Sequence, residues 1–433
     1  MKSFLAILLL CITASAAESP MLAVSVRGEN AVRLYDLQFT GYFGGNTWLR
    51  LTKSIPVGKQ PGEMCLAPDG KSLFVSDVGS KEISVVDLSS QTAVGTLSAP
   101  GMKSPDGCAV SADSKKVYSV DQGAGAVLVF SVESKQLLKT VAVGKEPRRA
   151  ILSPDGKRVL VSNAHSDSLS VIDTASDDVV KTVKTGEEPR DLAYSKDGKL
   201  LAVGLIAGDS VQFFDADTLE PKQQVAAVKS PEHMEFSPDS QRLYIVGKLS
   251  DDVGVMRIGQ SPRMARTIDV PHSPLGAWDA WGMALSPDGK FMWVTNTSDQ
   301  TISLIDVEYM QTVHAFPGGN GPVGVLYIKP AGGFSTMTPA AKLEHFRMLA
   351  KQAMDAVAKN DLPSATKLCQ TLETEWDSGE LDLRRSSPDV WNQVDEAMDN
   401  FIRPITTAGG VSPNPAALNT AYQNFLVKLK LVK

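Results

Sequence analysis

The chain repeats one pattern of about 42 residues along most of its length. One copy covers residues 141–186 and reads VAVGKEPRRAILSPDGKRVLVSNAHSDSLSVIDTASDDVVKTVKTG. A self-similarity of about 40–45 residues, with four short strands in each copy, is typical of a β-propeller. One copy cannot bury its apolar face alone, so neighbouring copies have to stack around an axis. The pattern therefore predicts a mainly-β propeller, but it leaves function open because propellers carry many activities.

The number of blades follows from the residue that opens each repeat. These anchors are Pro61, Pro105, Pro147, Pro189, Pro231, Ala280 (in the proline position) and Pro322. After the last anchor only one strand remains, Val323–Ile328, whereas Met21–Val57 holds three strands without an opening strand. Joining the two segments closes the ring and removes free sheet edges. We therefore predict a seven-bladed propeller over residues 17–330, closed by its N-terminal strands.

The repeat also resembles a known family. The pattern Pro-x-x-x-x-x-Ser-Pro-Asp-Gly-Lys, followed by a VLVSN strand and by SVIDTAS, is similar to the YVTN-type β-propeller repeat over Met21–Ile328. The Tyr-Val-Thr-Asn signature itself is only approximated, at Val159–Asn163 and Trp293–Asn296. The resemblance implies a bacterial secreted or periplasmic propeller, WD40-like and quinoprotein-like in fold. It implies a binding or surface protein and provides no catalytic residue to carry over.

The first residues have the pattern of a secretory signal peptide. Lys2 precedes an apolar run, Phe4–Thr13, and small residues follow at positions 14–16. We predict a signal peptide over residues 1–16, which is too short for a lasting membrane helix. No later apolar run reaches membrane length, so we expect a periplasmic or secreted protein without a transmembrane segment.

Beyond a predicted linker at residues 331–337, the apolar spacing becomes helical. Thr338 and Pro339 are typical of a helix start. Four helices are predicted, over Pro339–Lys359, Ser364–Trp376, Pro388–Ile402 and Ala416–Leu431. They predict a small α-helical bundle over residues 338–433. We expect its Trp and Met side chains to form the core of the bundle, and a docking surface for a partner is the alternative.

Three cysteines remain after the signal peptide. Cys65 and Cys108 lie on inner strands of neighbouring blades, and Cys369 lies on a predicted helix, where we expect it in the core. A Cys65–Cys108 disulfide is possible if the two strand faces oppose each other, and buried free thiols are the alternative. The sequence has no CxxCH motif for covalent haem and no zinc-like cysteine cluster.

The first two positions after each anchor should line the mouth of the axial channel, where ligands bind by default in concave folds. Most of them are charged, in contrast to the apolar third and fifth positions. We take the following as candidate ligand-binding residues: Glu63, Asp106, Arg148, Arg149, Arg190, Glu232 and His233. The alternative is a water-filled channel with ion pairs across it.

A longer connection precedes the sixth blade and should overhang this mouth. It adds Trp278, Asp279 and Trp281 to the ligand-binding candidates, because long loops on rigid scaffolds often carry function. A plug packed into the channel is the alternative. His165, His233 and His272 also map to this face, and with nearby carboxylates they are candidate metal ligands.

Two classes of function fit these features. The first is a binding or scaffold protein that takes a protein or small-molecule ligand at the mouth, and the absence of catalytic sequence motifs favours it. The second is a propeller enzyme of lactonase or lyase type, with His233 or His165 as base and the arginines holding an anion. A non-covalent quinone or haem protein is a third possibility; the cofactor is otherwise unknown or none.

The net charge of the chain and the closed ring of blades limit the kinds of partner that we expect. The formal net charge of −6 argues against binding nucleic acid. A closed propeller has little need to dimerise for stability, so we expect a monomer.

Overall fold

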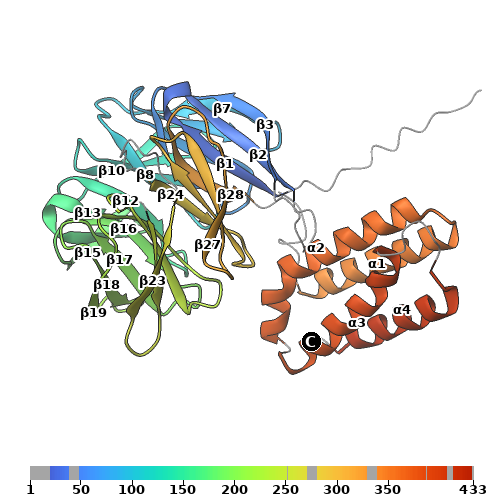
Figure 1. Cartoon of the computed structure of the whole chain (residues 1–433). Coiled ribbons are helices and arrows are strands. Elements are labelled where there is room, and N and C mark those ends of the chain that lie inside the picture. Colours follow the sequence, from blue (N-terminus) through green and yellow to red (C-terminus); the bar gives the residue numbers. More distant parts are fainter. Residues whose placement is uncertain are drawn as a thin grey trace, which may run out of the picture.

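The computed structural model describes residues 20–38, 48–250, 252–270, 280–328, 339–386, 388–406 and 413–431. Within these ranges the chain forms seven four-stranded antiparallel sheets, which follow one another around a ring (Figure 1). The predicted seven-bladed propeller is therefore confirmed. The predicted signal peptide and linker lie outside the described residues, so they remain predictions.

Blades 1 to 6 each run outward from an inner strand in chain order. Blade 1 contains β4 (Pro61–Leu66), β5 (Ser72–Asp77), β6 (Glu82–Asp87) and β7 (Thr92–Leu97). Blade 2 contains β8 (Pro105–Val110), β9 (Lys116–Asp121), β10 (Ala126–Ser131) and β11 (Leu137–Ala142). Blade 3 contains β12 (Pro147–Leu152), β13 (Arg158–Asn163), the short 3-10 helix η2 (Ala164–Ser166), β14 (Ser168–Asp173) and β15 (Asp178–Lys184).

The next three blades have the same order. Blade 4 contains β16 (Pro189–Tyr194), β17 (Leu200–Leu205), β18 (Ser210–Asp215) and β19 (Pro221–Ala226). Blade 5 contains β20 (Pro231–Phe236), β21 (Arg242–Gly247), β22 (Asp252–Arg257) and β23 (Arg263–Asp269). Blade 6 contains β24 (Ala280–Leu285), β25 (Phe291–Asn296), β26 (Thr301–Asp306) and β27 (Gln311–Pro317).

Blade 7 joins the two ends of the propeller. Its inner strand is β28 (Pro322–Ile328), and its outer strands are β1 (Met21–Val26), β2 (Ala31–Gln38) and β3 (Trp48–Pro56), with the short 3-10 helix η1 (Arg27–Glu29) between β1 and β2. β1 pairs antiparallel with β28, so that Met21 faces Ile328 and Leu22 faces Tyr327. The predicted closure by N-terminal strands is therefore confirmed, and it hydrogen-bonds the inner edge of β1.

The core of the propeller lies between the blades. The side chains three positions after the anchors are all buried: Met64, Cys108, Ala150, Leu192, Met234, Met283 and Val325. Met64 packs against Met21 and Ala23 of blade 7, in line with the strand alternation expected from the sequence. Burying an apolar side chain of this size contributes about 1.5–3 kcal/mol, so each blade is held by its neighbours.

The Ser or Thr of the repeat signature joins neighbouring blades next to the axis. The Ser162 hydroxyl donates to the carbonyl oxygen of Arg190 in blade 4 at 2.7 Å and accepts from the N–H of Arg149 in its own blade at 3.1 Å. Equivalent hydroxyls reach the next blade's carbonyl from Ser25 to Gly62, from Ser76 to Asp106 and from Thr295 to Val323. Each acceptor is the first residue after an anchor, so these bonds fix the backbone of the channel mouth.

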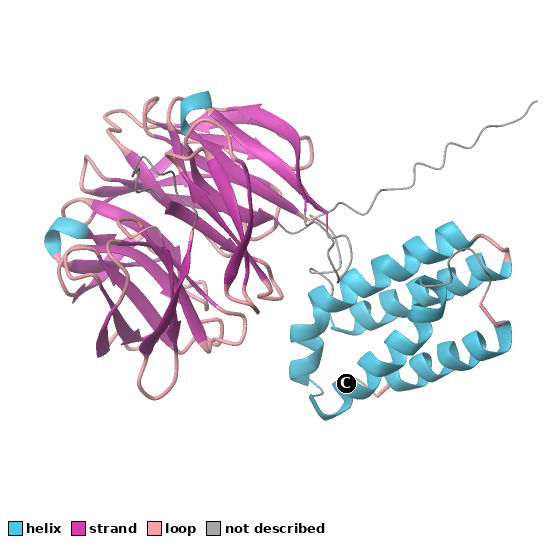
Figure 2. Ribbon diagram, in the orientation of Figure 1, coloured by secondary structure: helices cyan, strands magenta, loops and turns pink. Residues whose placement is uncertain are grey.

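Among the residues that the structure describes, the α-helices lie in the C-terminal part of the chain, and the two short helices in the propeller are the 3-10 helices η1 and η2 (Figure 2). The α-helices are α1 (Pro339–Ala358), α2 (Leu362–Ser386), α3 (Pro388–Thr406) and α4 (Pro415–Leu429). α2 runs ten residues beyond the predicted end at Trp376, because Gly379 lowers helix propensity by only about 1 kcal/mol and does not end the helix. α3 likewise continues past Ile402 through Pro404. No described helix is long and apolar enough to cross a membrane.

Aromatic side chains form the core of the helical region. Trp376 is 1% exposed and packs against Phe346 and Phe425, and its indole N–H donates to Asp395 at 2.9 Å. Cys369 is fully buried in the same cluster. The expected core roles of Trp376 and Cys369 are therefore confirmed.

Candidate binding site at the axial mouth

Side chains from blades 1 to 5 converge where the inner strands begin. Asp106 of blade 2, for example, interacts electrostatically with Glu63 of blade 1, Arg148 of blade 3, Arg190 of blade 4 and Glu232 of blade 5. These residues occupy the first or second position after the anchors, so all of them lie at the start of an inner strand next to the axis. The structure thus brings most of the predicted mouth residues into one cluster, which is mainly ionic.

Arg149 connects three blades within this cluster. Its Nη1 lies 2.5 Å from Glu63 Oε2 of blade 1, and its Nε lies 3.1 Å from Asp191 Oδ1 of blade 4. Blades 1 and 3 are not neighbours, so the Arg149–Glu63 pair crosses part of the channel. Burial disfavours the charged form of Glu63, but Arg149 and more distant positive groups hold its pKa below the usual value. Both partners therefore stay charged.

Arg190 makes the second cross-channel link. Its Nη2 and Nε lie 2.5 and 3.0 Å from Glu232 Oε1 of blade 5, and its Nη1 lies 3.5 Å from Asp106 Oδ2 of blade 2. Burial lowers the pKa of Arg190, but the charges of Glu232 and Asp106 outweigh burial and raise it. Arg190 is only 9% exposed, so this guanidinium is a fixed charge inside the channel mouth.

Arg148 lies further out, at the rim. It pairs with Glu146 and lies 3.8 Å from Asp106 Oδ2. Glu146 also contacts His165, whose Nδ1 lies 2.5 Å from Glu146 Oε2. Burial, with repulsion from Glu63 and other carboxylates, raises the pKa of Asp106 despite the nearby arginines. The Asp106 carboxyl is therefore a weaker acid than an exposed aspartate, although two arginines lie beside it.

His233 and His165 are not brought together. His233 Nδ1 lies 4.0 Å from Asp191 Oδ2, which already accepts the N–H of Met234 at 2.7 Å. Among the described residues, no group of three or more His, Cys, Asp or Glu side chains could hold a metal ion. His272, Trp278 and Asp279 lie outside the described residues. The metal site and the roles of these three residues therefore remain predictions.

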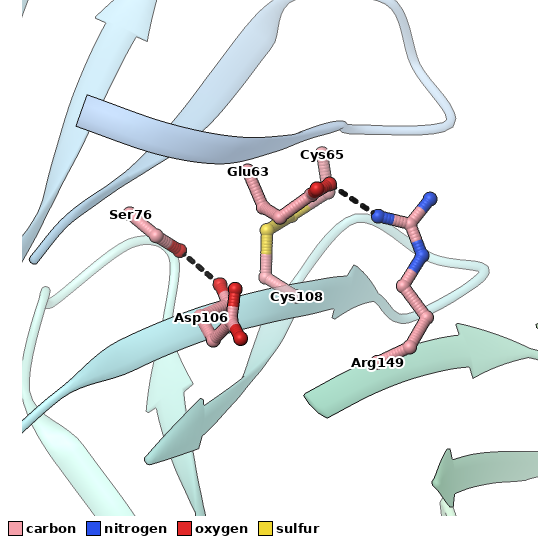
Figure 3. The surroundings of a disulfide bond; sticks show 6 residues. All are labelled: Glu63, Cys65, Ser76, Asp106, Cys108 and Arg149. Carbon is pink, nitrogen blue, oxygen red and sulfur yellow. Dashed lines mark hydrogen bonds and ion pairs between the residues drawn. A yellow bond between two sulfur atoms is a disulfide. The ribbon is translucent and has the colours of Figure 1, made fainter. Parts of the chain in front are cut away.

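A disulfide lies directly beneath the carboxylates. Cys65 and Cys108 are bonded, with their Cα atoms 5.8 Å apart (Figure 3). Both side chains belong to the cluster between blades 1 and 2, so the two strand faces oppose each other and the disulfide alternative is the one that the structure supports. Glu63 and Asp106 each precede a bonded cysteine by two residues. The disulfide therefore fixes the spacing of these carboxylates.

The opposite arc of the mouth, on blades 6, 7 and 1, has few charges on the inner strands. Its positions after the anchors are Trp281, Gly282, Val323, Gly324 and Gly62. A Cβ atom on Gly282 would lie 2.5 Å from the Val323 carbonyl oxygen, so the close contact between blades 6 and 7 requires glycine there. Trp281 is half-buried, and it is the one large side chain among these five positions.

Three cations surround the Trp281 ring. Lys248 Nζ lies 3.7 Å from the ring centroid, and the Cζ atoms of Arg27 and Arg190 lie 5.6 and 5.9 Å from it. Arg27 and Lys248 were missed as sequence candidates, whereas Asp191 is one of the positions after the anchors that were expected to line the mouth. Both cations come from connections between the second and third strands, as His165 does, and this shared loop position was the signal that could have identified them.

Comparison with known proteins gives the same fold. Residues 5–332 match the YNCE-like beta-propeller family. Hydrazine synthase from Kuenenia stuttgartiensis is 21% identical, with a TM-score of 0.55, over 66% of this chain and 93% of that chain. A functionally unknown protein from Desulfotomaculum acetoxidans is 13% identical, with a TM-score of 0.61, over 72% and 100%.

A Bacteroides fragilis protein described as a "putative 6-phosphogluconolactonase" is 15% identical, with a TM-score of 0.61, over 73% of this chain and 99% of that chain. No curated protein matches this chain. Likeness at these identities shows the fold alone.

Proposed function

Because the chain belongs to the YNCE-like beta-propeller family, we propose that it is an exported binding protein that takes a small ligand or a protein partner at the axial mouth of its propeller. The family assignment and the seven blades support a rigid scaffold. The proposal assigns the binding surface to the mouth, where five blades contribute charged side chains.

The observation that carries the proposal is the pairing of the mouth arginines. Arg148, Arg149 and Arg190 each contact carboxylates on other strands or blades. An enzyme that stabilises a developing oxyanion needs donors aimed at the reacting group, and these three guanidinium groups are already engaged. A fixed and internally paired surface favours binding, since little side-chain freedom is lost when a ligand docks.

Hydrolysis of a lactone is the second candidate, and one observation favours it. His233 lies beside Asp191 in the mouth, and a carboxylate next to an imidazole is a common arrangement for a general base. The 4.0 Å separation exceeds hydrogen-bond length, and Asp191 already contacts Arg149 and the Met234 amide. This pairing is weaker support than the engaged arginines.

Export is part of the proposal. The predicted signal peptide at residues 1–16 supports it, and so does the disulfide, because structural disulfides persist in oxidising compartments.

The test of the binding function uses protein recovered through its own leader and native mass spectrometry. We expect a stoichiometric adduct or a captured protein partner on the wild type. Arg149→Gln, which unpairs the centre of the mouth, should release it. Arg50→Gln is the matched control, because Arg50 pairs with Asp36 on the outer strands of blade 7. An adduct that survives Arg149→Gln would place binding elsewhere.

The same preparation tests the enzyme alternative on a panel of lactones. The binding proposal expects no turnover. Turnover that is lost in His233→Ala but kept in His314→Ala would overturn it in favour of hydrolysis. His314 is a suitable control because it is exposed on β27, where it contacts Phe316.

A further inference from the structure

Arg27 differs from the other arginines of the mouth because its side chain has no carboxylate partner. Among the described residues it makes no ion pair or side-chain hydrogen bond, and its Nε is buried without an acceptor. Arg148, Arg149 and Arg190 all contact carboxylates. A buried N–H without an acceptor is costly, and the position of Arg27 therefore needs an explanation.

The location of Arg27 is defined by its backbone and by Trp281. Arg27 begins the short connection η1 of blade 7, and its N–H donates to the Gly321 carbonyl oxygen at 2.8 Å. Its Cζ lies 5.6 Å from the Trp281 ring centroid, a cation–π distance. Its Nη2 lies 3.7 Å from the point where a Cβ atom on Gly62 would be. The guanidinium therefore spans the weakly charged arc from blade 6 to blade 1.

A second unpaired donor lies beside the first. The indole Nε1 of Trp281 is buried and has no hydrogen-bond partner. Lys248 adds a further positive group against the same ring, 3.7 Å from its centroid. Two donors without acceptors, from blades 7 and 6, one of them on the charged guanidinium of Arg27, indicate that an acceptor with negative charge is the missing partner.

We propose that Arg27 and Trp281 form an oxyanion subsite, which takes a carboxylate or phosphate group of the ligand on the arc between blades 6 and 1. This inference rests on the proposed function, because it concerns the same mouth. A guanidinium beside an aromatic ring still has its fork of N–H groups available to bind a carboxylate or phosphate. The ion-paired side chains of blades 1 to 5 then contact the rest of the ligand and orient it.

A substitution at Gly62 can test the subsite by filling it with a side chain of the protein itself. It occupies the same position after its anchor as Asp106, and the carbonyl of each accepts a serine hydroxyl from the preceding blade. A Cβ atom on Gly62 would have no neighbour closer than 3.7 Å, so a side chain fits. Gly62→Asp therefore places a carboxylate beside Arg27, where it should occupy the subsite permanently.

The experiment titrates inorganic phosphate and acetate into the full-length mature protein by calorimetry at constant ionic strength. We expect one site for at least one of these anions on the wild type. Arg27→Gln and Gly62→Asp should weaken binding about tenfold or more, since a bidentate charged contact is lost or blocked. Trp281→Phe, which keeps a ring and removes the N–H, should weaken it less. Arg50→Gln should bind as the wild type does.

Each outcome decides the inference. Phosphate binding without acetate binding identifies a phosphorylated ligand, and acetate binding identifies a carboxylate. Equal affinity in Arg27→Gln and wild type overturns the subsite, provided that both melt at the same temperature. Failure of both anions to bind the wild type also overturns it. Native mass spectrometry tests the proposed function separately. An adduct that is lost in Arg149→Gln but kept in Arg27→Gln would show that the ligand binds at the mouth without using this subsite.

Discussion

At the scale of single residues, the repeat contains a buried carboxyl group, that of Asp77, whose burial is unfavourable when it is charged. Asp77 ends β5, and its Oδ2 accepts from the Ser84 N–H and hydroxyl at 3.1 and 2.6 Å, while its Oδ1 is buried without a partner. Burial raises the pKa of Asp77 to about 6. The equivalent residues in blades 3 and 6 are Asn163 and Asn296, whose amide nitrogens donate to Ser170 and Ser303 at 3.0 and 2.9 Å.

Asp77→Asn should therefore stabilise the propeller near neutral pH. The folded state keeps a proton between about pH 4 and about pH 6 that the unfolded state has released, so the free energy of unfolding of the wild type falls as pH rises through this window. The asparagine variant lacks this loss, and we expect a gain of about 1–3 kcal/mol at pH 7 that shrinks towards pH 4. Urea unfolding at several pH values measures it.

Asp121 provides the matched control for this substitution. It ends β9 at the same place in blade 2, but its carboxylate accepts the N–H groups of Lys103 and Ser104 at 2.8 and 3.0 Å. Asp121→Asn replaces one acceptor oxygen by a donor and should not stabilise the protein. A similar gain in both variants would contradict the role given to the buried Asp77 carboxylate.

At the scale of strands and blades, the Ser162 hydroxyl of the repeat signature should contribute measurably to the free energy of unfolding. Ser162→Ala removes the donor to the Arg190 carbonyl and the acceptor of the Arg149 N–H, and both groups lie between blades 3 and 4. We expect a loss of about 1–3 kcal/mol in the free energy of unfolding. Ser134→Ala, on an exposed turn of blade 2, should change it little. An equal effect of the two substitutions would show that the bond between the blades contributes no net stability.

The elements were largely predictable, and the contacts between side chains were not. The repeat spacing placed the inner strands and the closure of blade 7, because strand alternation and turn chemistry are local. The pairing of each arginine with a carboxylate depends on how far the side chains extend across the channel. Arg149, for example, contacts Glu63, which lies two blades away. Arg27 was missed for the same reason, since its neighbour Trp281 is on another blade. The end of α2 was missed because the low helix propensity of Gly379, about 1 kcal/mol, is not enough to end a helix.

At the scale of the whole molecule, the disulfide ties two blades whose cysteines are 43 residues apart. Removing a cross-link of this span, as in a Cys65→Ser, Cys108→Ser double variant, should lower the free energy of unfolding by about 2–4 kcal/mol. Thermal unfolding with and without a reducing agent measures it. The reductant should lower the melting temperature of the wild type and leave that of the double variant unchanged. Equal melting of the oxidised wild type and the double variant would show that the bond adds no stability.

The closure of blade 7 also determines when this protein can finish folding. The amide of Gly324 donates to the Ser25 hydroxyl over a separation of 299 residues, and β1 finds its inner partner only in β28. During synthesis β1, β2 and β3 emerge first, and they wait with an open edge until six other blades have been made. Folding dominated by such distant pairings is slow and exposes strand edges to aggregation. A chaperone that shields the first three strands would therefore act on the yield of this propeller rather than on its final stability.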